Sequence, residues 1–482
     1  MFTIQIQNIR LKSALLAFVA GSIVLPVFAF AQNSTSSNSS PENQITEFEV
    51  NGLKILVKRR PGSATVAAGL FFRGGVRNLN AKNAGIENFM LSVATEASKK
   101  YPREVLRREL AGTGSGIGSG SNYDFSALSL ASTREGFDRT WDAFIDIAFN
   151  PSFAPQDIEL TRGKMLAGLR EQESDPDNTL QVMVDKTINA NTAYAVDPSG
   201  TIETVSSFKA EDLQAYHQKV MQTSRLLLVI VGDFDAETLK PRIAAAFGKL
   251  PRGDYKVPAV PVLDFSRPTL DITTRNLPTN YVEGVFNAPS LNAPDYYAMR
   301  IAISLLQGRI FQEVRVRRSL SYAPNAEMHD LAANTANIYV TAVDANTAVK
   351  VMLDEVKTMR TELIEQETIP RIAGHFLPLY YLDQETSGAQ AAELAKYELI
   401  GGGWQRAQKF LDGIRSVTPE QIRAASVKYM KNIRFVVVGN PTAIDRSIFL
   451  QNSSSNLSAF APKGSAGIVL DHTGAFSVPF GN

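Results

Sequence analysis

Histidine is the commonest metal ligand among protein side chains, and this sequence contains only four histidines. Two imidazoles can hold one zinc ion from a helix when they stand four residues apart on the same face. No two of the four have a helical ligand spacing: His217, His329, His375 and His472. Cysteine, the other frequent zinc ligand, is absent. The residues therefore predict no zinc site in this chain.

A row of glycines suggests a different chemistry, phosphate binding. Five glycines occupy alternate positions of one segment: Gly112, Gly114, Gly116, Gly118 and Gly120. A dinucleotide fingerprint lies between a strand and the helix after it, whereas this row follows a helical stretch and leads into a strand. Glycines at alternate positions can let another backbone approach closely, or they can simply make the segment flexible. Both interpretations stay open.

The charge balance excludes one large class of partner. The 482 residues carry 49 Lys and Arg against 48 Asp and Glu, which leaves a net charge of +1. Nucleic-acid-binding domains need a clustered excess of basic side chains to neutralise phosphates, so we expect no DNA or RNA partner. With 44% apolar residues, the chain is long enough to bury two hydrophobic cores.

The two ends of the sequence differ from the rest in composition. Residues 1–31 have the basic, apolar and small-residue regions of an export signal, which predicts cleavage after Ala31. A membrane span is the alternative, but it needs about 20 apolar residues, and Pro26 fits cleavage better. We expect no stable span after cleavage, a flexible lead at 32–44 and a low-complexity tail at 446–482.

Residues 45–250 predict a first domain that mixes strands and helices. Apolar and polar residues alternate on both sides of Asn51-Gly52, a pattern typical of a hairpin with a primed turn. Further strands are expected at 64–73, 125–132 and 226–231, and a helix with one apolar face at 137–149.

The proline-rich residues 251–268 interrupt all periodicity and predict a linker. Residues 269–445 then predict a second domain, which restarts the pattern of strands and helices. Strands are expected at 270–274, 281–286, 338–343 and 435–438, and a helix with one apolar face at 349–363.

The two domains look like copies of one unit. The segment that begins at Ser207 matches the segment that begins at Ser416, 209 residues later, and the closing strands repeat at nearly the same offset. In the second copy Thr418 and Gln421 predict a capping box at the start of a helix. Each copy mixes strands with longer helices, which is the α+β pattern.

Three segments resemble the short bacterial form of the pitrilysin/insulinase (inverzincin) family of zinc metallopeptidases: 71–78, 85–90 and 311–322. The resemblance covers nearly the whole mature chain, including the duplication, the linker and the closing strand of each half. It implies an α+β fold with two homologous halves. Each half would be a mainly antiparallel sheet with helices packed on one face, and the two would form a clamshell.

The zinc motif of this family is missing. In active members the first helix carries H-x-x-E-H, whose histidines hold zinc while the glutamate takes a proton from the metal-bound water. The corresponding positions here are Asn88, Leu91 and Ser92. Neither imidazole is present, and an apolar Leu91 cannot act as a base. The resemblance therefore implies an inactive member that binds no metal and does not hydrolyse peptides by itself.

A second family motif, R-x-x-x-x-L-x-Y, is present, and Arg315 and Tyr322 match its Arg and Tyr. In active members these side chains reach across the closed chamber towards the scissile peptide, where they stabilise the oxyanion. Val316 departs from the pattern, because many relatives have an acidic residue there. In the alternative interpretation, Arg315, Arg317 and Arg318 form a solvated basic helix end, and Tyr322 merely packs.

Two functions follow from the resemblance. The first is the non-zinc subunit of an exported heterodimeric peptidase, in which a homologous partner supplies the zinc and this chain supplies Arg315 and Tyr322. An extended peptide substrate would pair with the edge strand at Gly118, Ser119 and Gly120. The second is a non-catalytic peptide-binding or scaffold protein of the same fold. The expected location is the periplasm, with secretion as the alternative.

Overall fold

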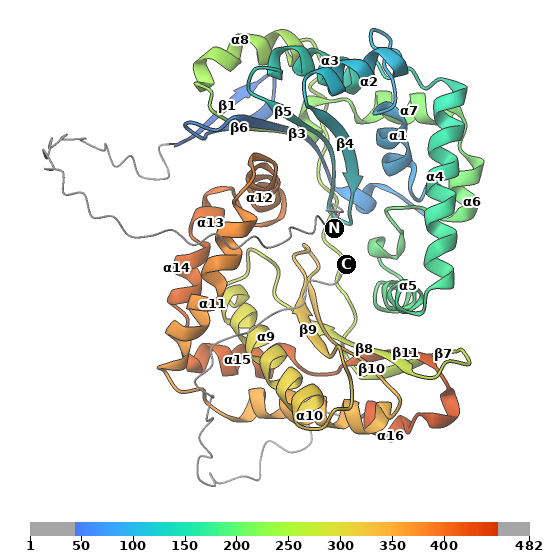
Figure 1. Ribbon diagram of the computed structural model, residues 1–482, viewed down its shortest axis with the longest axis vertical. Coiled ribbons are helices and arrows are strands. Elements are labelled where there is room, and N and C mark those ends of the chain that lie inside the picture. The colour runs from blue at the N-terminus through green and yellow to red at the C-terminus, as the bar shows by residue number, and fades with distance from the viewer. Residues whose placement is uncertain (1–43, 452–482) are drawn as a thin grey trace, which may run out of the picture. The chain divides into compact units, whose positions relative to one another are not determined.

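The computed structural model describes residues 44–451, all of which fall within one compact unit (Figure 1). The predicted signal peptide, nearly all of the predicted lead and residues 452–482 lie outside the described residues. In the part of the chain that is described, no helix is long and apolar enough to cross a membrane. The fold is α+β with two sheets, as the sequence analysis expected.

The first sheet has the strand order β1-β2-β6-β3-β5-β4. Neighbouring strands are antiparallel except for the parallel pair β2 and β6. The predicted hairpin is confirmed: Asn51 and Gly52 join its strands with φ angles of 50° and 82°, the left-handed region that a primed turn needs. The bounds are β1 (Ile45–Val50), β2 (Leu53–Arg59), β3 (Thr65–Arg73), β4 (Gly116–Ser121), β5 (Phe125–Thr133) and β6 (Leu226–Gly232).

In the described chain the second sheet has the order β7-β11-β8-β10-β9, and its only parallel pair is again the one that includes the closing strand, β11 with β7. The bounds are β7 (Thr269–Thr274), β8 (Asn280–Asn287), β9 (Asn325–Met328), β10 (Thr335–Ala342) and β11 (Arg434–Gly439). The duplication is therefore visible in the topology as well as in the sequence.

The helices of each half pack mainly on one face of its own sheet. In the first half α1, α3, α7 and α8 share a core with that sheet, and in the second half α9, α10 and α15 do the same. The first-half helices are α1 (Ile86–Ala94), α2 (Arg103–Gly112), α3 (Phe137–Phe149), α4 (Pro155–Ser174), α5 (Pro176–Ile188), α6 (Ile202–Ser207), α7 (Ala210–Val220) and α8 (Ala236–Phe247). Those of the second half are α9 (Tyr296–Ile310), α10 (Ala345–Thr361), α11 (Thr368–Asp383), α12 (Ser387–Ile400), α13 (Gln405–Gln408), α14 (Phe410–Arg415), α15 (Pro419–Tyr429) and α16 (Arg446–Phe449).

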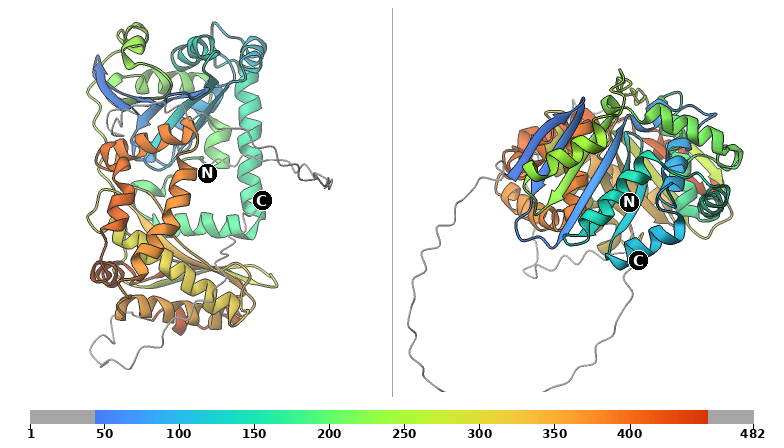
Figure 2. Two further views of the ribbon diagram at one scale, coloured as in Figure 1. Left: turned by 60° about the vertical axis from the view of Figure 1, so that its left-hand side comes forward. Right: turned by 90° about the horizontal axis from the view of Figure 1, so that it is seen from above.

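Each half also lends one helix to the opposite face of the other half's sheet. α5 of the first half packs on β8 and β11, and α12 of the second half packs on β3 and β6. Each of these helices directly follows a long helix of its own half: α4 precedes α5, and α11 precedes α12 (Figures 1 and 2). The sequence analysis expected helices on one face of each sheet and did not anticipate this reciprocal second layer.

The exchange explains why β6 is apolar throughout. Because side chains alternate along a strand, Leu228 and Ile230 face the core of the first half, while Leu227 and Val229 face the core that includes α12. A strand covered on both faces reads as a continuous apolar run rather than an alternating one.

Three details of the second half refine the sequence analysis. The predicted capping box is confirmed, since Thr418 and Gln421 cap each other's backbone at the start of α15. The helix predicted at 349–363 ends earlier than expected: α10 ends at Thr361, and Leu363 is 50% exposed. The folded part extends beyond residue 445, because Phe449 of α16 is buried against Phe435 of the closing strand.

Candidate functional site

Helix α1 carries the three positions where a zinc motif would stand. Leu91 is 3% exposed and belongs to the first core, whereas Asn88 and Ser92, four residues apart, lie on the partly exposed face of the helix. Among the described residues, no group of three or more His, Cys, Asp or Glu side chains is placed to hold a metal ion. These positions therefore do not fit zinc.

The exposed face of α1 lies beside the edge strand β4. The Oγ of Ser92 is 3.4 Å from the Oγ of Ser119. Ser121 and Ser126 form a cross-strand pair close by in sequence, and their buried hydroxyl oxygens have no hydrogen-bond partner within the described chain. Hydroxyls are weak bases but can donate to or accept from a peptide group. This neighbourhood suits peptide contact rather than metal chemistry.

Within the described residues, strand β4 is the edge of the first sheet and pairs only with β5, so none of them occupies its outer backbone groups, which can pair with another chain. The predicted Gly118, Ser119 and Gly120 all belong to it. A Cβ atom at Gly116 would meet nothing within 4 Å, and one at Gly118 would meet only the Oγ of Ser129 at 3.8 Å. Internal packing therefore does not require these two glycines.

A buried ionic network joins α1 to the rest of the first half, and the sequence analysis missed it. Glu87 of α1 forms an ion pair with Arg225, and the hydroxyl of Tyr216 donates to the same carboxylate at 2.7 Å. Burial opposes the charge of Arg225, but Glu87 outweighs it, and the pKa of Arg225 is raised. The available signal was a charged residue within an otherwise apolar helix face, since buried charges need partners.

The Arg315 and Tyr322 pair lies in the second half, where α9 continues into a π-helical turn, η5 (Phe311–Val316). The guanidinium carbon of Arg315 is 4.0 Å from the ring centroid of Tyr322 and 5.1 Å from that of Phe311. Tyr322 is 75% exposed, so it does not merely pack. Single-turn π-helical segments inside α-helices frequently mark functional sites.

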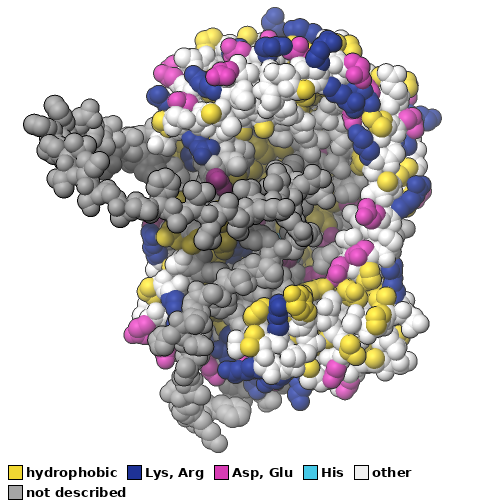
Figure 3. Space-filling model, viewed as in Figure 1, with side chains coloured by type: hydrophobic (Ala, Val, Ile, Leu, Met, Phe, Trp, Pro, Cys, Tyr) yellow, Lys and Arg dark blue, Asp and Glu magenta, His cyan; other side chains and the backbone are white. Residues whose placement is uncertain are grey.

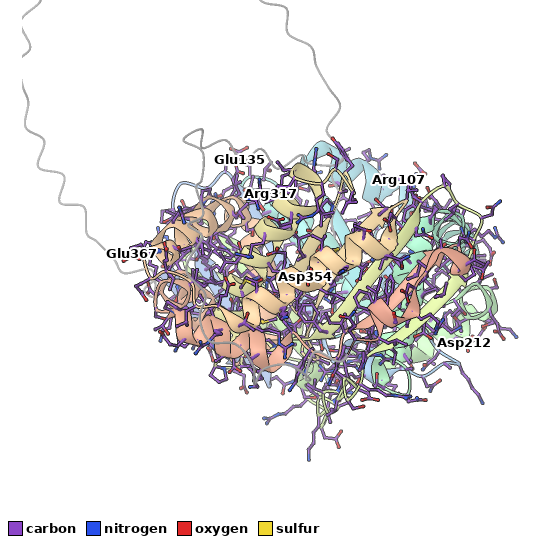
Figure 4. The ribbon with its side chains drawn as sticks, turned by 90° about the horizontal axis from the view of Figure 1, so that it is seen from below. Arg107, Glu135, Asp212, Arg317, Asp354 and Glu367 are labelled. Carbon is purple, nitrogen blue, oxygen red and sulfur yellow. The ribbon has the colours of Figure 1, made fainter. Side chains whose placement is uncertain are left out.

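The other two arginines of this segment are paired. Glu313 forms ion pairs with Arg317, at 2.5 Å, and with Arg318. Arg317, labelled in Figure 4, is well exposed. Within the described chain no acidic side chain pairs with Arg315, which therefore keeps its donors available. The segment is not a uniformly solvated basic helix end.

The structure does not bring the first-half and second-half positions into direct contact. No hydrogen bond, ion pair or ring contact in the described part of the chain joins Arg315 or Tyr322 to Asn88, Leu91 or Ser92. On the face of the molecule seen in Figure 3, basic and acidic side chains are interspersed rather than gathered in one patch.

Comparison with protein families decides the membership. Residues 54–200 match the model of insulinase (peptidase family M16), and residues 207–373 match that of the peptidase M16 inactive domain. The chain belongs to peptidase family M16. Most of both halves is included in the two matches, which agrees with the duplicated topology.

Among M16 relatives, an uncharacterized zinc protease of Streptomyces coelicolor is 22% identical over 78% of this chain and 84% of its own length. The mitochondrial-processing peptidase subunit beta of Caenorhabditis elegans is 25% identical over 57% of this chain and 60% of its own length. Both matches are distant, so the chemistry of this chain has to be argued from its own residues.

Solved structures share the fold. A peptidase M16 inactive domain from Pseudomonas fluorescens superposes with a TM-score of 0.72 at 18% identity, over 82% of this chain and 98% of that one. A protease from Helicobacter pylori superposes with a TM-score of 0.73 at 13% identity, over 82% and 99%. The two-halved α+β fold of this M16 chain is therefore shared with these proteins along almost their full length.

Proposed function

We propose that this chain is the non-zinc subunit of a two-chain M16 peptidase, to which it contributes Arg315 and Tyr322. The observation that carries the proposal is the state of Arg315, which has no acidic partner among the described residues and is stacked on an exposed Tyr322 while the arginines beside it are paired. If this segment served only solubility, there would be no reason for Arg315 to lack an acidic partner in the described chain while the arginines beside it are paired.

The chemical role follows from the two side chains. A guanidinium keeps its charge at every working pH and offers several N–H donors, and a phenol adds one O–H donor. Donors aimed at the oxygen of a peptide carbonyl stabilise the negative charge that develops there during hydrolysis. Stacking on Tyr322 limits the motion of the guanidinium, so less entropy is lost when it meets the substrate.

The zinc and the general base are assigned to a homologous partner, because Asn88, Leu91 and Ser92 cannot supply them. This chain is similar to a mitochondrial-processing peptidase subunit, and to a chain of complex III2 from Candida albicans at a TM-score of 0.70. Both similarities support the proposal that it acts as a subunit of a multi-chain assembly. The substrate class is extended peptides, which the open edge of β4 can bind by strand addition.

The deciding experiment is purification of the tagged chain from its native host, followed by peptide-cleavage assays with and without any stoichiometric partner. Cleavage confined to the complex and abolished by a chelator would support the proposal. Zinc-dependent cleavage by this chain alone would contradict it.

A second candidate, favoured by the open β4 edge alone, is a non-catalytic peptide-binding or scaffold protein. It predicts peptide binding by the isolated chain and no homologous zinc-bearing partner.

We also place the chain in the periplasm, with secretion into the medium as the alternative. The support is the export signal expected within residues 1–31, followed by predicted cleavage after Ala31. Fractionation of the native host, with N-terminal sequencing of the mature chain, tests both the compartment and the cleavage site.

A further inference from the structure

One of the two reciprocal helix–sheet contacts contains an unusual buried acid. α5 lies on the inner face of the second sheet, where Leu180, Val184 and Ile188 share an apolar cluster with residues of β8 and β11. Glu283 stands in the middle of β8 on this same face and is 1% exposed. A carboxyl group therefore lies beneath a helix that belongs to the other half.

The partners of Glu283 are neutral amides. The side chain of Gln181 on α5 donates to one carboxyl oxygen, and that of Asn337 on β10 donates to the other at 2.8 Å. No ion pair involves Glu283 in the described part of the chain. One of its two hydrogen bonds thus crosses between the halves, and no cation among the described residues pairs with it.

The charged groups around Glu283 do not favour its ionised form. Asp185 on α5 and Glu327 on β9 both act on it with like charge. On β10 the nearest titratable group is Tyr339, whose hydroxyl bonds to Asp177 of α5. On β11 the cation Arg434 donates its hydrogen bonds to the carbonyl groups of Thr187 and Asp264 and to the hydroxyl of Thr269. Burial above all, with the two acids, raises the pKa of Glu283 from 4.5 to about 7, although the amide donors oppose this.

The reciprocal contact provides an internal comparison. The register places Gly69 of β3 opposite Val229, as Glu283 of β8 stands opposite Val436 in the duplicated strand, so the first sheet has glycine at the equivalent point. Around α12, Lys54 pairs with Glu398 at 2.8 Å and with Glu47 at 3.0 Å, whereas burial raises the pKa of Glu393 on the same helix.

We propose that Glu283 is a proton-operated latch between the two halves: in its protonated form it seats α5 on the second sheet, and on ionisation it loosens that helix. The proposal does not depend on the identity of a partner or on catalysis. It would let pH govern how readily the halves separate to admit a large ligand.

The direction with pH follows from linkage. In the seated state Glu283 holds its proton up to about pH 7, whereas in an opened, hydrated state it ionises near its ordinary value of 4.5. The opened state therefore binds fewer protons, and opening becomes more favourable as pH rises between these two values. Between pH 6 and pH 8 the opening equilibrium should increase about tenfold and then level off.

Hydrogen exchange measured by mass spectrometry tests the latch in the full chain. The readout is the exchange of residues 176–188 in the wild type relative to the same residues in Glu283→Gln, at pH 6, 7 and 8, so that the intrinsic pH dependence of exchange cancels. We expect this ratio to rise about tenfold between pH 6 and pH 8. Equal pH responses in the two proteins would overturn the proposal.

Two matched variants sharpen the test. Glu283→Gln keeps the size of the side chain and removes its titration, whereas Asp185 of α5, whose pKa burial raises to about 6, still titrates in both proteins. Glu327→Gln removes an exposed acid from the neighbouring edge strand and should keep most of the pH response. An undiminished pH response in Glu283→Gln, or the loss of the response in Glu327→Gln, would refute the assignment to Glu283.

Discussion

Arg315 and Tyr322 are stacked, with the guanidinium carbon 4.0 Å from the ring centroid, although seven positions separate them in the chain. The turn between them includes Ser319 with a φ of 52°, a left-handed conformation that is uncommon for a residue other than glycine. Backbone strain of this kind persists where the surrounding structure requires it, and it gathers at functional sites.

The first prediction uses the contrast between two neighbouring arginines. Arg315→Ala should lower turnover by the complete peptidase complex about 100-fold to 1000-fold, as loss of one oxyanion donor does elsewhere. Arg317→Ala removes the same charge from a side chain already paired with Glu313 and should change turnover little. Steady-state kinetics of the two complexes, with assembly checked by size-exclusion chromatography, measures the difference. Equal losses in both variants would show that only net charge matters.

The second prediction separates the two interpretations of the glycine row. Gly118→Leu should leave the free energy of unfolding nearly unchanged, because its Cβ would meet only the Oγ of Ser129 at an ordinary contact distance of 3.8 Å, yet weaken binding of extended peptides to the β4 edge. Gly69→Ala is the contrasting variant, since its Cβ would lie 2.4 Å from the Phe71 ring, and overpacking costs about 1–3 kcal/mol. Urea unfolding and peptide titration measure the two effects. Unchanged peptide binding in Gly118→Leu would favour plain flexibility.

The sequence could predict the features that depend on near neighbours. The hairpin at Asn51-Gly52, the capping box of Thr418 and the closing strands all follow from the local chemistry of a few residues, and the structure has them. Because the sequence is duplicated, the elements predicted from local patterns in the first half could also be expected in the second half. A family resemblance then supplied the two-halved fold.

The sequence could not predict contacts between distant segments. Glu87 and Arg225 are 138 positions apart, and the residues near one of them do not indicate that the other is its partner. The exchange of α5 and α12 is equally remote, and its only trace is the unbroken apolar run of β6, which indicates that both faces of the strand are covered but not by which segments. At the site, spacing alone could not tell Arg315 from Arg317, because the distinction rests on where Glu313 lies in three dimensions.

The third prediction concerns the buried network below α1. Glu87→Ala leaves the charge of Arg225 buried without its acid, so the free energy of unfolding should fall by about 3–5 kcal/mol. Glu237→Ala breaks an exposed pair with Lys240 and should cost less than about 1 kcal/mol. Urea denaturation of both variants provides the comparison. A small loss in Glu87→Ala would mean that the network does not anchor α1.

The fourth prediction is an acid sensitivity opposite in sign to that of Glu283. Burial would raise the pKa of Asp330, but Arg300 and Lys396 outweigh it and hold that pKa below the ordinary 3.8. Asp330 therefore stabilises the fold above pH 3.8, and this contribution is lost as pH falls further. Asp330→Asn should be less stable than wild type at pH 7, with the gap narrowing towards pH 3. Asp412→Asn, at an exposed position, is the control, and an Asp330→Asn gap that does not change with pH would contradict the assignment.

The fifth prediction is that the lost zinc site cannot be restored by exchanging side chains alone. Asn88→His with Ser92→His should fold, because both positions are partly exposed, and should bind Zn²⁺ weakly through two imidazoles. Adding Leu91→Glu should lower the free energy of unfolding by about 2–5 kcal/mol, because that position is buried in the first core. Calorimetric titration with Zn²⁺ and urea unfolding check both steps, with the wild type as the control that should show no zinc binding. A stable triple variant that cleaves peptides with zinc would show that the helix still has the geometry of an active site.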